Sequence, residues 1–364
     1  MSLKILRIIP IACFLGALWL PLAQMNLHLF DEFENPEKRE LAPAPEFNAG
    51  NLAKFKKDFE AFAADNFGLR SDLIRWNCML RVRLLGVSPV PSVILGKDSW
   101  LFYRSEALDD GNTFDDFRGI LPISDWELEK VRLRLAENQR EFSRIGARYL
   151  VVVVPNKSTI YSEYLPEKFR KAGPGTRLDQ FMAYMKANSN VAVLDLRGPL
   201  FAAKKAFPVY SKTDSHWNSY GAYVGFREIA RHFSGEFPSI GPAHIAEEKV
   251  EVRKTFPGGD LAQMLFMHDV MPEENDTGFS LAGTPQTPPL GTLILRHDSF
   301  GDNLYPYVNA VFKRVVNIAP FAPYRMDAIE RERPQIVVHV FAERYIPRAL
   351  HDDYFYKEEV GSGG

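Results

Sequence analysis

The sequence has 364 residues, of which 46% are hydrophobic and 25% are charged, so a disordered or fibrous chain is excluded. Its 44 Lys and Arg nearly balance 46 Asp and Glu, and no basic field indicates nucleic-acid binding. Two cysteines exclude a disulfide scaffold and a cysteine-rich zinc module. The length predicts one large domain or two modest ones.

The N-terminus departs from these averages. Lys4 and Arg7 precede an uncharged apolar run over residues 8–23, which is typical of a secretory signal or a membrane anchor. The run is short for a bilayer span of about 20 residues. A cleavage site after Ala23 is weakened by the proline two residues before it. An uncleaved signal-anchor is favoured over a cleaved signal peptide in residues 1–24, with a buried core helix as a third interpretation. Both favoured interpretations place the rest of the chain outside the cytoplasm.

The rest of the chain divides into four segments by its pattern. Residues 25–50 are charged and proline-rich, which predicts a linker that leaves the membrane. Apolar residues at three- and four-residue steps predict a helical lead-in over 51–104, packed on the main domain. The main domain is predicted over 105–350, with an irregular Gly- and Pro-rich insertion at 233–290 that shapes a site, and residues 351–364 form a tail.

Helices and strands alternate through the main domain. Ser124 and Glu127 form a capping box at the start of one helix, and Gly146 suits its end. Continuous apolar runs over 149–154 and 191–196 are typical of strands buried on both faces. Further helices are predicted near 178–186 and 219–232, and further strands over 293–295, 315–318 and 336–340. The alternation predicts an α/β domain whose parallel sheet has helices on both faces.

Three polar groups flank these elements, at the sheet edge where open parallel sheets bind ligands. Residues 155–158 follow the first strand, residues 213–218 precede a helix, and residues 296–302 follow the strand at 293–295. Within the last group, Ser299 lies in a short turn between a strand and a glycine. This position predicts a hydroxyl exposed at the top of the sheet.

A serine nucleophile needs a base and a carboxylate that orients the base. In an extended segment residues i and i+2 project to one side, so Asp214 could bond one ring nitrogen of His216 while the other faces Ser299. The pattern predicts a Ser-His-Asp hydrolase or transferase. Two alternatives are open: Ser299 as a turn residue, and a metal site formed by Asp214, His216, His297 and Asp298.

Five further side chains are candidates for substrate or oxyanion binding, each with a structural alternative. Asn156 and Lys157 could donate to an oxyanion or hold an acidic sugar, or else cap a helix and form a surface ion pair. Tyr103 and Trp217 could stack on a sugar ring or lie in the core. Arg344, after the last predicted strand, could reach the site or pair with the preceding glutamate.

Several stretches together resemble a known family over about residues 38–345. They are Phe-Gly-Leu-Arg-Ser-Asp at 67–72, Gly-Lys-Asp-Ser-Trp-Leu-Phe-Tyr at 96–103, Val-Pro-Asn-Lys at 154–157 with Tyr161, and Thr-Asp-Ser-His-Trp-Asn at 213–218. The chain resembles the alginate O-acetyltransferase group (AlgJ/AlgX-like), whose catalytic domain is similar to SGNH hydrolases.

The resemblance implies a three-layer α/β/α, SGNH hydrolase-like (flavodoxin-like) fold and an O-acetyltransferase with a triad of Ser299, His216 and Asp214. It implies acetyl transfer, through an acetyl-serine, to hydroxyls of a secreted exopolysaccharide at the periplasmic face of the inner membrane. A membrane-bound O-acyltransferase (MBOAT-type) partner would supply the acetyl groups, and no cofactor or metal is expected. A periplasmic acetylesterase with the same triad and a non-catalytic scaffold are the alternatives.

The sequence departs from the family pattern at three places. Ser99 stands where the signature has glycine, and His297 replaces the glycine of the usual Gly-Asp-Ser block. The Asp-X-His pair precedes the serine, the reverse of ordinary SGNH enzymes. The glycine and asparagine that complete the oxyanion hole of SGNH enzymes are not located in this sequence, so only the backbone N–H of Ser299 is assigned as an oxyanion donor.

Overall fold

The computed structural model describes residues 3–31, 33–35, 37, 39–47, 49–105, 112–240, 248–255, 257–281, 288–320 and 322–346. The chain forms two compact units, Met1–Val90 with Ala262–Val270, and Pro91–Leu261 with Met271–Gly364. The segment at 93–103, which the sequence pattern grouped with the lead-in, belongs to the second unit. Leu101 N donates to Lys212 O at 2.9 Å, and the Trp100 ring stacks on Tyr161 at 4.2 Å.

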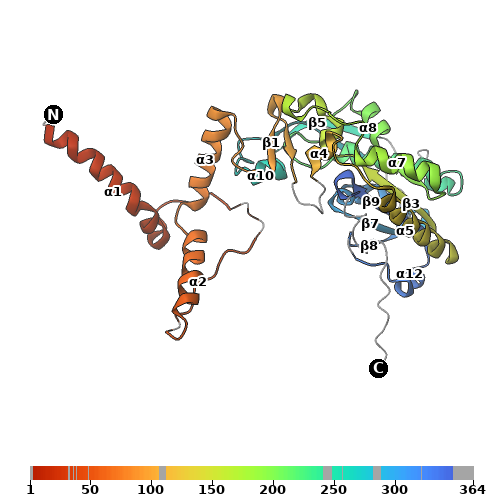
Figure 1. Cartoon of the computed structure of the whole chain (residues 1–364), viewed down its shortest axis with the longest axis horizontal. Helices are drawn as coiled ribbons and strands as arrows, with labels where there is room; N and C mark the ends of the chain where they lie inside the picture. Colours follow the sequence, from red (N-terminus) through yellow and green to blue (C-terminus); the bar gives the residue numbers. More distant parts are fainter. Residues whose placement is uncertain are drawn as a thin grey trace. The chain divides into compact units, whose positions relative to one another are not determined.

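The first unit contains three long helices, α1 (Leu3–Leu27), α2 (Leu52–Asp65) and α3 (Arg70–Leu85) (Figure 1). Within α1, Ile8–Leu27 is long and apolar enough to cross a membrane, because the helix continues past the predicted run through uncharged residues. The helical pattern predicted from 52 to 85 is broken between α2 and α3, where Leu69 adopts a φ of 63°.

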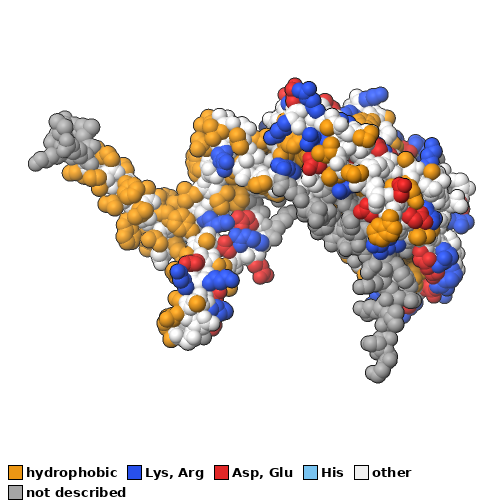
Figure 2. Space-filling model, viewed as in Figure 1, with side chains coloured by type: hydrophobic (Ala, Val, Ile, Leu, Met, Phe, Trp, Pro, Cys, Tyr) orange, Lys and Arg blue, Asp and Glu red, His pale blue; other side chains and the backbone are white. Residues whose placement is uncertain are grey.

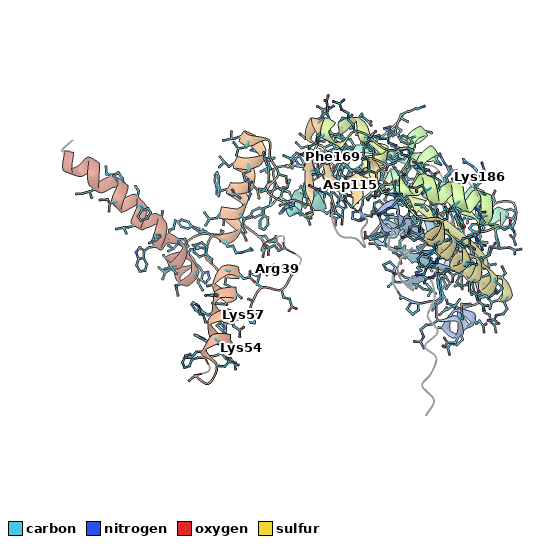
Figure 3. The ribbon with its side chains drawn as sticks, viewed as in Figure 1. Arg39, Lys54, Lys57, Asp115, Phe169 and Lys186 are labelled. Atoms are coloured by element: carbon cyan, nitrogen blue, oxygen red, sulfur yellow. The ribbon has the colours of Figure 1, made fainter. Side chains whose placement is uncertain are left out.

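No side chain of α2 is buried, so the stability of this helix depends on the contacts at its two ends. The Asn51 side chain accepts from Lys54 N at 3.0 Å and caps the first turn. Arg39, which precedes the helix, pairs with Asp65 in its last turn at 2.7 Å. Figure 3 labels Arg39 together with Lys54 and Lys57 of α2.

The second unit begins with the antiparallel pair β1 (Val93–Leu95) and β2 (Leu101–Tyr103). The turn between them contains two left-handed residues, Asp98 with a φ of 52° and Ser99 with a φ of 64°. Glycine adopts this conformation at no steric cost, which accounts for the glycine that the resembling family has in place of Ser99.

A five-stranded parallel sheet forms the centre of the second unit, in the order β4-β3-β9-β7-β8. Its strands are β3 (Arg148–Val154), β4 (Val193–Asp195), β7 (Leu290–His297), β8 (Phe312–Ile318) and β9 (Pro334–Ala342). All five strands predicted from the apolar runs are confirmed, and so is the parallel α/β architecture. The run at 191–196 differs from the prediction in its burial, because β4 lies at the edge of the sheet and is only half-buried.

Helices cover both faces of this sheet, which confirms the three-layer α/β/α fold. Leu150 and Val152 of β3 pack in the core below one layer, and Val151 and Val153 pack in the core below the other. The first layer contains α4 (Thr113–Phe117), α6 (Lys157–Ile160), α8 (Arg197–Ala203), α9 (Ser219–Phe233) and α11 (Tyr305–Val311). The second contains α5 (Asp125–Arg144), α7 (Arg177–Asn188) and α12 (Met326–Glu332). The predicted capping box of Ser124 and Glu127 starts α5.

The insertion expected at 233–290 is more regular than its composition indicates. It contains an antiparallel ribbon of β5 (Glu248–Thr255) and β6 (Glu273–Leu281), separate from the central sheet, and the short helix α10 (Asp260–Met264). Val250 and Val252 alternate with charged residues, and this period of two was the signal for β5 that the Gly and Pro content obscured.

The packing of α9 on Trp217 gives a stability prediction. A Cβ added at Gly225 would lie 2.7 Å from Trp217 Cη2 and 2.8 Å from Cζ3. We therefore expect Gly225→Ala to lower the free energy of unfolding by about 1–3 kcal/mol, measured by urea denaturation. The matched control is Gly198→Ala in α8, where nothing lies within 4 Å of the added Cβ. The control should be unchanged or more stable by up to about 1 kcal/mol, and equal destabilisation of both variants would contradict the packing argument.

Candidate active site

Ser299 lies exposed at the carboxyl end of β7, as the first residue of a 3₁₀ helix over Ser299–Leu304. The buried Asp298 carboxylate fixes this turn, because it accepts from Phe300 N at 2.9 Å and from Ala342 N of β9 at 2.7 Å. Gly301 allows the chain to pass His297, since a Cβ there would lie 2.1 Å from His297 Cγ. The turn therefore holds the Ser299 hydroxyl above the sheet.

The structure brings Ser299, His216 and Asp214 together in one hydrogen-bonded chain. His216 Nε2 lies 2.8 Å from Ser299 Oγ, and Nδ1 lies 2.8 Å from Asp214 Oδ1. The backbone N–H of His216 also donates to Asp214 Oδ1 at 2.8 Å, which is the spacing of i and i+2 expected from the sequence. With Nδ1–H donating to the carboxylate, Nε2 is left to accept the serine proton.

Electrostatics keep Asp214 ionised in this chain. Burial alone would raise the pKa of the Asp214 carboxyl, but the hydrogen bonds and charge of His216 outweigh it and lower the pKa to about 2. The carboxylate is therefore charged throughout the neutral pH range, and this charge can orient the His216 ring and stabilise its protonated form.

A second carboxylate, Asp260, lies against the same ring nitrogen. Its Oδ2 is 3.5 Å from His216 Nδ1 and accepts from Ser215 Oγ at 2.5 Å, while Oδ1 accepts from Ser215 N at 2.7 Å. Asp260 N donates to Asp214 Oδ2 at 3.0 Å, so the two acids are linked. Burial and the charge of Asp214 raise the pKa of Asp260. From the sequence, the segment of Gly258, Gly259 and Asp260 is expected as a plain turn rather than as a close approach to a ligand, so Asp260 was not assigned to the site.

The metal site considered from the sequence is not assembled from its four residues. His297 Nδ1 lies 2.6 Å from Asp298 O, and its Nε2 lies 3.1 Å from Tyr305 Oη, so both ring nitrogens have other contacts. In the part of the chain that the structure describes, Asp214, His216 and Asp260 do place potential metal-ligand atoms within 4.8 Å of one another. The two carboxylates of this group are the ones that lie against His216 Nδ1, at 2.8 Å and 3.5 Å.

The loop that carries Asp214 is held from inside the protein by Lys157 and Glu273. Lys157 Nζ donates to Lys212 O at 2.7 Å and to Asp214 O at 2.8 Å, and the Glu273 carboxylate accepts from Lys212 N at 2.6 Å and Thr213 N at 2.5 Å. Burial lowers the pKa of Lys157 to about 7 and raises the pKa of Glu273. Lys157, expected as a donor to substrate, is therefore bonded to the backbone of the loop.

Trp217 joins this loop to the serine turn. Its Nε1 donates to Phe300 O at 2.9 Å, and Asn303 Nδ2 donates to Trp217 O at 2.9 Å. The side chain is fully buried. The structure thus corresponds to the core alternative for Trp217, because no face of its ring is open for a sugar.

Tyr103, Asn156 and Arg344 line a small pocket together with Ser215, the neighbour of His216. The Arg344 guanidinium lies 5.1 Å from the centre of the Phe300 ring and 5.3 Å from that of Tyr103. The preceding Glu343 accepts from Asn156 N at 2.8 Å and Thr159 Oγ1 at 2.7 Å, and so fixes the backbone at Asn156. These three candidates therefore remain grouped beside the site.

The fold and this arrangement define an SGNH hydrolase-like α/β domain with a serine at the end of a sheet strand. Residues 93–279 match the family model described as the SGNH hydrolase-like domain of the acetyltransferase AlgX, and the chain belongs to this family. The protein is accordingly an O-acetyltransferase.

The relatives extend along most of the chain. It is 25% identical over 387 residues to the probable alginate O-acetylase AlgJ of Pseudomonas syringae pv. tomato, covering 96% of this chain and 90% of that protein. It is 27% identical over 293 residues to the AlgJ of Pseudomonas putida, covering 71% of each chain. The structure of Bacillus cereus PatB1 superposes with a TM-score of 0.51 at 13% identity, covering 73% of this chain and 99% of that one, which shows the shared fold.

Glu343 gives a prediction for pH dependence. Burial, with repulsion from Asp116, raises the pKa of Glu343 from 4.5 to about 7. The folded state thus holds a proton that the unfolded chain releases, so the free energy of unfolding falls as pH rises from about 4.5 to about 7. In Glu343→Gln we expect this fall to be smaller by about 3 kcal/mol, measured by urea denaturation at several pH values. Identical pH dependence in both proteins would show that Glu343 is ionised throughout.

Asp260 gives a prediction for activity. In Asp260→Asn, the charge beside His216 Nδ1 is lost while the shape of the side chain is kept, so we expect kcat for an activated acetyl ester to fall about tenfold at unchanged KM. The matched control is Asp276→Asn in the same insertion, whose carboxylate contacts Ser211 and not the histidine. Equal rates for Asp260→Asn and the control would refute a role for Asp260 in positioning His216.

Proposed function

We propose that this protein transfers acetyl groups to hydroxyls of a secreted bacterial exopolysaccharide through an acetyl ester on Ser299. The observation that carries the proposal is the chain of hydrogen bonds from the exposed Ser299 hydroxyl through His216 to Asp214, at 2.8 Å for each contact. The polysaccharide acceptor is supported by the relatives, which are named as probable alginate O-acetylases.

In the first half of the reaction, His216 Nε2 takes the proton from Ser299 Oγ as this oxygen attacks the carbonyl carbon of the acetyl donor. The bond from that carbon to the donor's leaving group breaks, and the leaving group departs with the proton from His216. Asp214 and Asp260 stabilise the imidazolium between these transfers. The backbone N–H of Ser299 is the candidate donor to the oxyanion.

In the second half, His216 takes a proton from a sugar hydroxyl, whose oxygen attacks the acetyl-serine carbonyl carbon. The ester bond to Ser299 Oγ breaks, and His216 returns the proton to this oxygen. Water in place of the sugar would release acetate, so an acetylesterase is the competing function of the same three residues. The distinction depends on which hydroxyl reaches the ester first.

The proposal places the enzyme on the periplasmic side of the inner membrane, tethered by α1. The helix is long and apolar enough to span a bilayer, and basic residues precede its apolar run. An MBOAT-type membrane protein would supply acetyl groups to Ser299 from the same membrane. The chemistry assigned to Ser299, His216 and Asp214 uses no cofactor of its own.

The test of the proposal is mass spectrometry after incubation with an activated acetyl ester. We expect one added acetyl group on Ser299 in the wild-type protein and loss of at least about 99% of the adduct in Ser299→Ala and His216→Ala. Ser215→Ala is the matched control, because this hydroxyl lies 3.3 Å from His216 Nδ1, the ring nitrogen that does not face Ser299. A wild-type protein that forms no adduct, or turnover that survives in Ser299→Ala and is lost to a chelator, would refute the mechanism.

A further inference from the structure

Helix α3 exposes apolar side chains along one stripe. Leu73, Trp76, Leu80 and Leu84 recur at three- and four-residue steps, and their exposed fractions are 49%, 63%, 53% and 75%. Val87, just beyond the helix, continues the stripe at 48%. Figure 2 shows apolar side chains gathered over α3 as well as over α1. A single exposed leucine needs no explanation, but a continuous stripe of this kind marks a binding surface.

Three charged residues of α3, Arg70, Asp72 and Arg75, have partners inside the first unit. Arg75 pairs with Asp269 and lies over the Phe33 ring at 4.8 Å. Asp72 accepts from Phe33 N at 3.2 Å, and Arg70 pairs with Glu37 at 2.8 Å. The first turns of the helix therefore have their charged side chains bonded within the protein, while its large apolar side chains are exposed, the reverse of a helix that faces water.

Contacts with the end of α1 fix where α3 begins. A Cβ on Gly68 would lie 2.2 Å from Pro21 O and 2.9 Å from Met25 N, so the backbone before α3 passes directly against the last turns of α1. Gln24 is buried beside it and bonds the backbone of Phe30 at 2.7 Å and 3.0 Å. If α1 spans the membrane, α3 starts at the membrane surface.

We propose that the stripe of Leu73, Trp76, Leu80, Leu84 and Val87 lies in the periplasmic surface of the same bilayer that holds α1. The inference rests on the membrane anchoring proposed above. A helix at a lipid interface has tryptophan and leucine on the face that enters the lipid and basic residues nearby. The stripe has this composition, with Arg83 as the nearby basic residue. A stable protein partner would need about 20–30 residues on each side, far more than one stripe offers. Contact with lipid would keep the first unit at the membrane surface.

Photocrosslinking in the full-length protein tests the proposal. Trp76 is replaced by p-benzoylphenylalanine, the protein is reconstituted in vesicles of phosphatidylethanolamine and phosphatidylglycerol, and adducts are identified by mass spectrometry after irradiation. We expect lipid adducts at position 76. The same probe at Leu15 of α1 reports on the anchor, and at Trp126 of α5, which is 69% exposed, it provides the water-facing control.

The three positions separate the possible failures. Lipid adducts at 15 but none at 76, or adducts at 76 only to another segment or a second copy of this chain, would overturn the inference and leave the anchor intact. An absence of lipid adducts at 15 would overturn the anchor itself. As a second measurement, Leu80→Glu with Leu84→Glu should reduce lipid adducts at 76 at least about fivefold, since charge is expelled from the interface. Both side chains are exposed, so the unfolding transition should not move, and undiminished lipid adducts would contradict the proposal.

Discussion

The site depends on the hydrogen bond between His216 and Ser299, which joins two segments that lie 83 residues apart. Other contacts hold each of the two segments in the position that this bond requires. The serine turn is fixed by Asp298, which bonds the backbone of β9, and the histidine loop is fixed by Lys157 and Glu273. Trp217 then ties the loop to the turn. The contact proposed as catalytic is thus assembled by side chains that are themselves buried.

Burying this many charged groups in one place has a cost, and hydrogen bonds offset it. The charges of Asp214, Asp260 and Glu273 favour the ammonium form of Lys157, and each of these acids accepts backbone N–H bonds. The outcome differs between the acids: the pKa of Asp214 is lowered by His216, whereas the pKa of Asp260 and Glu273 is raised by burial. The acid bonded to the histidine is the one whose charge is stabilised most.

Local patterns predicted the sheet well because each strand contains a short continuous apolar run, and β3 and β9 are buried on both faces. The grouping of Asp214, His216 and Ser299 was also foreseeable, since parallel strands end at one edge and i, i+2 residues share a side. The positions of Asp260, Lys157 and Trp217 were not. Their roles depend on contacts between distant segments, and a buried lysine or tryptophan has the same letter in a sequence as an exposed one. The ribbon of β5 and β6 was obscured by glycine and proline around it.

The central claim is that an acetyl group passes from Ser299 to a sugar hydroxyl rather than to water. The most direct measurement is a single-turnover chase, in which protein acetylated by an activated ester is freed of excess donor and mixed with unacetylated oligosaccharide. The account predicts that the acetyl group leaves the protein and appears as an ester on the oligosaccharide, faster than it appears as acetate. Release of acetate alone, at a rate independent of the oligosaccharide, would contradict it.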